Sequence, residues 1–298
     1  MELSRRHALR LGAATAGLGV TGSFAGCSSV PFVGGSDYTA WLPEPGTIRD
    51  GLDAYDFRQM DAAEVRTKED NFDGHTYASY EERGDSTLDL VGLDFDDANR
   101  FLAYQGITVV DASYERAEVA DELGDEEFEE ATDHEGYTVY TDANEYRAVA
   151  VSGGTIVFGR RGGDTDAVDV VERAIDTKKG DEDRYTEANE DFDLLVSTLD
   201  TGTFTRGTGF EDGDRAAQGR SVSVHESTTT VEVVVVYEDA DAVDAEEVTA
   251  IEDQDEDRDD IRRLSANKNG RVVTVSWDTD TDILGTDEYD GVGFAFGR

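Results

Sequence analysis

Short segments of alternating apolar and polar residues predict an antiparallel meander in the middle of the chain. Three segments, 137–141, 146–151 and 155–158, are rich in valine, tyrosine and threonine, which favour strands. Asp142-Ala143-Asn144 and Ser152-Gly153-Gly154 separate these segments and have the composition of tight turns. The pattern therefore predicts three neighbouring strands joined by hairpins.

A helical spacing of apolar residues follows the meander. The residues that recur at this spacing are Ala167, Val168, Val171, Ala174 and Ile175. Asp164 and Asp166 lie at the start of the predicted helix, where the helix macrodipole favours carboxylates. Lys178 and Lys179 lie at its end, where the macrodipole favours cations. Gly180 then suits the left-handed conformation of a C-cap. We expect a helix between these limits with one face packed on the core.

The region before the meander predicts a strand, a helix, a strand and another helix. Residues 88–93 alternate as a strand does, and Asp96 is placed to cap a helix that ends at Gly106. One face of this predicted helix would carry Ala98, Phe101, Leu102 and Gln105. A strand over 107–110 and a helix over 116–123 follow.

The second half of the chain predicts a similar order of elements. Residues 221–225 and 230–237 predict a hairpin, and Asp241 opens a helix predicted through Ile251. A short helix around Ile261 and Leu264 leads to a strand over 271–277. We interpret the chain as an α+β fold of antiparallel sheets with packed helices. It divides into two related modules, 51–182 and 183–298, of ordinary domain size. One continuous sheet is the alternative.

The first 27 residues carry two motifs of an export signal. Ser4-Arg5-Arg6-His7-Ala8-Leu9-Arg10 precedes a short apolar stretch, which ends in Phe24-Ala25-Gly26-Cys27. A basic start, an apolar segment and small residues before a cleavage point define such a leader. It resembles the twin-arginine signal of an exported lipoprotein, with Arg5 and Arg6 as the pair. The usual Phe and Leu of these motifs are replaced by Ala8 and Phe24. The resemblance implies cleavage after residue 26 and a lipid on Cys27, which would anchor the domain at the extracytoplasmic face of the membrane.

Residues 27–50 predict a tether, because all three prolines of the chain, Pro31, Pro43 and Pro45, lie there. Trp41 and Leu42 within it would either dock on the domain or rest at the lipid interface. Cys27 is the sole cysteine of the chain, so no intramolecular disulfide can form. Stability must therefore come from a packed core.

The charge of the chain is extreme, with 69 acidic against 26 basic residues and a formal net charge of -43. Self-repulsion of this size would strain a compact state at low ionic strength, whereas molar salt screens charges beyond about 3 Å. Arginine greatly outnumbers lysine, and the composition resembles that of haloarchaeal proteins. Most acidic runs are then a solvated surface. A basic stripe for phosphate contacts is missing from the sequence, so nucleic acid is not expected as a partner.

Two weak candidate ion sites remain, together with three scattered histidines. Asp278, Asp280 and Asp282 alternate as calcium ligands do, but the glycine and the terminal glutamate of a calcium loop are replaced. Arg160 and Arg161 lie between a predicted strand and a helix N-terminus, where an anion could bind. His75, His134 and His225 could contribute to a zinc site with carboxylates, although ordinary surface positions are favoured. We expect no specific metal and no cofactor.

These observations favour a membrane-anchored surface protein that binds an envelope or membrane protein and catalyses no reaction. A solute-binding lipoprotein of a transporter is the alternative, although such proteins usually have two lobes of parallel sheet. A hydrolase that uses carboxylates alone is the third hypothesis, and it would require a deep cleft with two convergent carboxylates.

Overall fold

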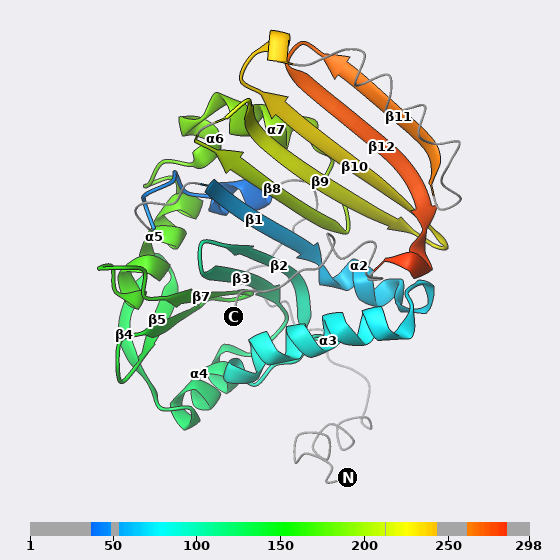
Figure 1. Ribbon diagram of the computed structural model, residues 1–298. Helices are drawn as coiled ribbons and strands as arrows, with labels where there is room; N and C mark the ends of the chain where they lie inside the picture. Colours follow the sequence, from blue (N-terminus) through cyan, green and yellow to red (C-terminus); the bar gives the residue numbers. More distant parts are fainter. Residues whose placement is uncertain (1–36, 49–53, 212, 243–260, 285–298) are drawn as a thin grey trace, which may run out of the picture. The chain divides into compact units, whose positions relative to one another are not determined.

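The computed structural model describes residues 37–48, 54–211, 213–242 and 261–284, and its strands form one antiparallel sheet (Figure 1). The sheet has twelve strands in the order β11-β12-β10-β9-β8-β1-β2-β3-β7-β6-β5-β4. The bounds are β1 (Ala54–Asp61), β2 (Ala98–Tyr104), β3 (Ile107–Ala112), β4 (Phe128–His134), β5 (Tyr137–Asp142), β6 (Arg147–Val151), β7 (Thr155–Arg160), β8 (Phe204–Phe210), β9 (Arg215–His225), β10 (Thr228–Tyr237), β11 (Arg262–Asn269) and β12 (Val272–Asp280). The predicted α+β class with antiparallel sheet is confirmed.

Helices cover both faces of this sheet and enclose two hydrophobic cores. The α-helices are α2 (Ala62–Thr67), α3 (Gly74–Leu88), α4 (Arg116–Asp125), α5 (Ala167–Lys179), α6 (Tyr185–Ala188) and α7 (Glu190–Thr198). Short 3-10 helices are η1 (Asp37–Trp41), η2 (Glu69–Asn71), η3 (Asp89–Val91), η4 (Ala240–Ala242) and η6 (Thr281–Ile283). The first core includes residues of η1, α5, α6 and α7, and the second includes residues of α2, α3 and α4. In β6, Ala148 and Ala150 enter the first core, whereas Val149 and Val151 enter the second. Alternation along one strand therefore supplies both cores.

The sheet continues across the boundary predicted between residues 182 and 183. β1, from the first predicted module, pairs with β8, from the second, so that Phe57 lies opposite Gly207. A Cβ atom at Gly207 would lie 2.4 Å from the Phe57 ring, so glycine is needed for this close approach. The sheet is thus continuous, as the alternative prediction states. A duplication of the two halves stays a prediction.

Several predicted elements are confirmed. The meander is β5, β6 and β7, the helix over 116–123 is α4, and the later hairpin and strand are β9, β10 and β12. Helix α5 has the predicted ends. Asp166 accepts a hydrogen bond of 3.0 Å from the backbone N–H of Asp169, and Gly180 adopts a φ of +87°. The sequence pattern was sufficient here because propensity, caps and burial all favour the same helix.

The helix predicted between Asp96 and Gly106 is wrong, because this segment forms strand β2. A register shift between Ala98 and Arg100 interrupts the alternation of the strand. Ala98 and Phe101 therefore enter the same core although they are three positions apart, a spacing that a helix also produces. The bulge made a strand resemble a helix in sequence.

Two further predictions are corrected. The strand predicted over 88–93 is the end of α3 followed by η3, in which Leu88 and Val91 are both buried at a helical spacing. The short helix predicted around Ile261 and Leu264 is strand β11, whose pairing with β12 shifts register between Arg262 and Ser265. Beyond η4, the helix predicted from Asp241 to Ile251 lies outside the described residues.

The last part of the predicted tether is packed on the fold. Trp41 is 5% exposed and Leu42 is fully buried, so these residues dock on the domain. The Lys178 ammonium lies 5.7 Å from the centre of the Trp41 ring, and Arg173 donates a hydrogen bond of 2.6 Å to the carbonyl of Thr47. Segment 37–48 is thus held by α5.

Candidate functional site

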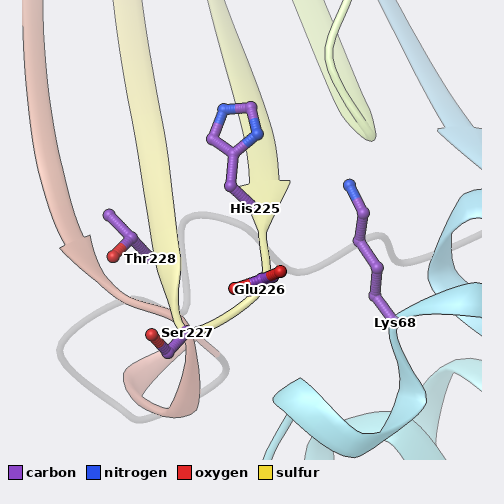
Figure 2. Close-up of a pocket in the computed structure, with 5 residues that line it drawn as sticks. All are labelled: Lys68, His225, Glu226, Ser227 and Thr228. Carbon is purple, nitrogen blue, oxygen red and sulfur yellow. The ribbon is translucent and has the colours of Figure 1, made fainter.

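A solvent-open surface cavity of about 460 Å³ lies at the turn between β9 and β10, facing the end of α2 (Figure 2). Its lining residues are Lys68, His225, Glu226, Ser227 and Thr228. In Figure 2, Lys68 and His225 extend toward the same space, whereas Thr228 points to the other side of the hairpin. The lining is polar, with one cation, one carboxylate, one imidazole and two hydroxyl groups.

Contacts on both sides of the hairpin fix this turn. His225 pairs with Thr228, which leaves Glu226 and Ser227 as the connecting residues. Thr281 of η6 donates its backbone N–H to the carbonyl of Ser227 and its hydroxyl to the carbonyl of Glu226, both at 3.1 Å. Glu226 has a φ of +29°, in the left-handed region that side chains other than glycine rarely adopt. The turn is therefore held by η6 rather than by its own sequence preference.

The ammonium group of Lys68 is partly committed to the fold. It lies at the C-terminal end of α2 and donates hydrogen bonds to the carboxylate of Glu64 and the carbonyl of Val224. An ammonium has three donors, so one remains for a ligand. His225 is exposed, and its imidazole makes no hydrogen bond within the described part of the chain. The site can offer a few hydrogen bonds to a small polar or anionic group.

The three histidines lie on separate elements. His134, on the edge strand β4, places its Nε2 atom 2.6 Å from Asp176 Oδ1 and its Nδ1 atom 3.8 Å from Glu172 Oε1. These contacts join β4 to α5. His75 lies in the first turn of α3, and His225 lines the cavity. Over the residues described here, no group of three potential ligands is placed to hold a metal ion.

The three aspartates predicted as weak calcium candidates contact other partners. Asp278 is 6% exposed, accepts a hydrogen bond of 2.8 Å from the hydroxyl of Thr230, and forms an ion pair with Arg263. Asp280 forms an ion pair with Arg262, and Asp282 is exposed in η6. Since β11 supplies arginines to two of the three carboxylates, these two already have cationic partners.

The predicted anion candidates Arg160 and Arg161 are exposed at the end of β7. Asp166 already caps the following helix, as its position in the sequence indicates. Residues Arg5, Arg6 and Cys27 lie outside the described residues, so the export signal and the lipid site stay predictions.

Sequence reasoning missed the cavity. Lys68 is one of four lysines in a chain with 69 acidic residues, and this rarity was the available signal. His225 was considered as a possible zinc ligand, and the other lining residues were predicted only as part of a hairpin. Their proximity to α2 depends on pairing between distant strands, which no local pattern reports.

Comparison with known proteins gives a distant structural likeness. No family model matches the sequence, and no curated protein matches it. The fold is similar to crystal forms III, IV and I of TP0453, with TM-scores of 0.47, 0.46 and 0.45 and sequence identities of 10%, 10% and 11%. The alignments cover 84–85% of this chain and 98–100% of those chains. Similarity at this level carries no conclusion about activity.

Proposed function

We propose that this chain is an exported lipoprotein, anchored through Cys27 at the extracytoplasmic face of the membrane, which acts there as a non-catalytic binding module. The observation that carries this proposal is the leader, in which Arg5 and Arg6 precede an apolar stretch and Cys27 follows small residues. Among the described helices, none is long and apolar enough to cross a membrane. A lipid on Cys27 would supply the attachment.

The way the chain enters the fold is compatible with a short anchor. Nine residues lie between Cys27 and Asp37, where η1 begins, so the ten Cα–Cα steps of a fully extended chain span at most about 36 Å. Trp41 and Leu42 are buried immediately afterwards. If Cys27 carries a lipid, the tether is therefore short, and the binding surface acts close to the membrane.

The described architecture favours a binding module over the solute-binding alternative. Solute-binding lipoproteins usually close two lobes of parallel sheet over a ligand, whereas the described residues of this chain form one continuous antiparallel sheet with a core on each face. The cavity at the β9–β10 turn contains one carboxylate, Glu226, whereas the hydrolase hypothesis requires a convergent pair. We therefore propose recognition of a partner through the protein surface.

Fractionation of cells that express leader variants tests this proposal. We expect Cys27→Ser to release the exported protein from the membrane, while the control Ser29→Ala stays bound. Arg5→Lys combined with Arg6→Lys should leave uncleaved precursor inside the cell, whereas Arg10→Lys should not. Membrane retention of exported Cys27→Ser would refute the lipid anchor.

A further inference from the structure

An exposed tyrosine lies beside arginines where the β5–β6 connection meets the end of β7. With 53% of its surface exposed, Tyr146 is the large hydrophobic residue that stands out to solvent among the described residues. Its backbone is fixed on both sides. The N–H donates to Asp142 Oδ1 at 2.9 Å, and the carbonyl accepts from the N–H of Arg161 at 2.9 Å. The aromatic ring is thus presented from a rigid backbone.

Three arginines are backbone neighbours of this tyrosine. Arg147 lies opposite Arg160 across β6 and β7, and Arg161 follows directly. Arg147 donates from Nε to Asp142 Oδ2 at 3.0 Å, and its guanidinium lies 5.0 Å from the centre of the Phe128 ring. We call Tyr146, Arg147, Arg160 and Arg161 the arginine–tyrosine patch.

Arg160 and Arg161 differ from the other arginines of the described ranges. Their guanidinium groups have no hydrogen bond and no ion pair within those ranges, although the chain carries 69 acidic residues. The acidic neighbours Glu145 and Asp164 form no ion pair with them within 4.0 Å. Within the described ranges, these two exposed guanidinium groups are therefore available to bind carboxylates of a partner.

The composition of this patch is that of a protein-binding surface. Tyrosine and arginine are enriched at the energetically dominant positions of interfaces, because they combine apolar area with directional hydrogen bonds. A guanidinium binds a carboxylate through two parallel hydrogen bonds. Molar salt screens charges beyond about 3 Å, so a direct contact of this kind persists at high salt whereas longer-range attraction is lost.

The number of charges favours a protein over a lipid surface. Attraction to anionic lipids usually depends on clusters of about 4–8 basic residues acting near the membrane. The patch has three arginines, one of which is already paired with Asp142. An exposed tyrosine on a fixed backbone, with a few arginines next to it, instead fits a protein surface that carries carboxylates.

We propose that the arginine–tyrosine patch docks a carboxylate-rich face of an envelope protein. This inference rests on the proposed function and gives the chemistry of the expected partner. Tyr146 would insert into the contact, while Arg160 and Arg161 would each bind a carboxylate of the partner.

Site-specific photo-crosslinking of the full membrane-anchored protein in its native high salt tests the proposal. Position 146 is replaced by a photoreactive phenylalanine derivative, and the crosslinked residue is mapped by mass spectrometry. We expect a protein crosslink whose attachment point lies next to aspartate or glutamate. Arg160→Glu with Arg161→Glu should lower its yield by at least about tenfold. The control Lys179→Glu with Arg215→Glu has the same charge change at other exposed positions and should leave the yield unchanged.

The remaining outcomes would overturn the inference. A crosslink to lipid, to a second copy of this chain, or to a protein surface without carboxylates would do so, as would an equal loss of yield in the control. Reversal of the mapped carboxylates to lysine should restore binding to the glutamate variant, which a merely misfolded variant could not show. Failure here with Cys27→Ser still released from the membrane would reject the patch and leave the anchor standing.

Discussion

Two clusters of arginine near strand ends differ in how the fold uses them. At the β11–β12 edge, Arg262 and Arg263 form ion pairs with Asp280 and Asp278, so the carboxylates that resemble a calcium loop have partners within the chain. In the arginine–tyrosine patch, Arg160 and Arg161 have no such partners in the described ranges. Of these two charge motifs, only the unpaired arginines are therefore available to bind a partner.

The difference arises from strand pairing. β11 is an edge strand that runs antiparallel to β12 and therefore places its arginines beside the aspartates of β12. At the other site Arg160 faces Arg147 across β6 and β7, and like charges opposite each other do not stabilise a sheet. An external anion would relieve this unfavourable pairing.

The largest expected effect is loss of the whole fold at low salt, which would remove both clusters together. With a net charge of -43, repulsion among the carboxylates acts over about 30 Å at 0.01 M salt but over about 3 Å at 1 M. We expect the protein to unfold on dilution from multimolar NaCl, and circular dichroism measures this unfolding. A melting temperature that does not change with salt concentration would contradict the halophilic interpretation.

A smaller effect is expected when residues of the two clusters are replaced, because the replacements should change the free energy of unfolding by different amounts. Asp278→Ala removes a buried acceptor of the Thr230 hydroxyl and the ion pair with Arg263, and should reduce the free energy of unfolding by about 1–3 kcal/mol. Arg160→Ala with Arg161→Ala should change it by less than about 0.5 kcal/mol. Urea titration at constant high salt measures both. Equal losses would mean that the patch is structural.

The smallest expected effect is on the free energy of unfolding at acidic pH. Burial alone would raise the pKa of Asp142, but hydrogen bonds from the Tyr146 N–H and from Arg147 outweigh it, and the pKa lies below its ordinary value of 3.8. The ionised carboxylate therefore stabilises the fold above the pKa of the unfolded chain, and this contribution is lost as the pH falls through the folded pKa.

The variant Asp142→Asn keeps the size of the side chain but cannot ionise. Its free energy of unfolding should lie below that of the wild type at neutral pH, and the difference should shrink in acid. Parallel curves at every pH would show that the charge of Asp142 does not hold the patch.

Much of the fold was predictable where local signals agree. Helix α5 has an apolar stripe, a capping aspartate and a C-terminal glycine, and the β5–β7 meander has turn residues between β-branched segments. Prediction failed at β2, where the register shift beside Ala98 produces a helical spacing, and at β11, where a similar shift occurs. The pairing of β1 with β8 joins distant segments and has no local signature.

The sequence identified several residues of the candidate sites, but it did not predict which other residues they contact. Arg160 and Asp278 were both candidates in the sequence. Asp278 has an ion-pair partner and Arg160 has none in the described ranges, and this difference depends on which strands become neighbours. Tyr146 was predicted as an ordinary strand residue, although it lies just before β6 and is exposed. Lys68 reaches the β9–β10 turn through contacts between α2 and a strand more than 150 positions away.

The most direct test of the account is the mass of the N-terminal peptide of the protein isolated from membranes. Both the proposed function and the arginine–tyrosine patch assume that the domain is exported and held by a lipid. The account predicts a peptide that begins at Cys27 and carries lipid mass on its sulfur. A peptide that retains residues 1–26, or that begins at Cys27 with a free thiol, would contradict it.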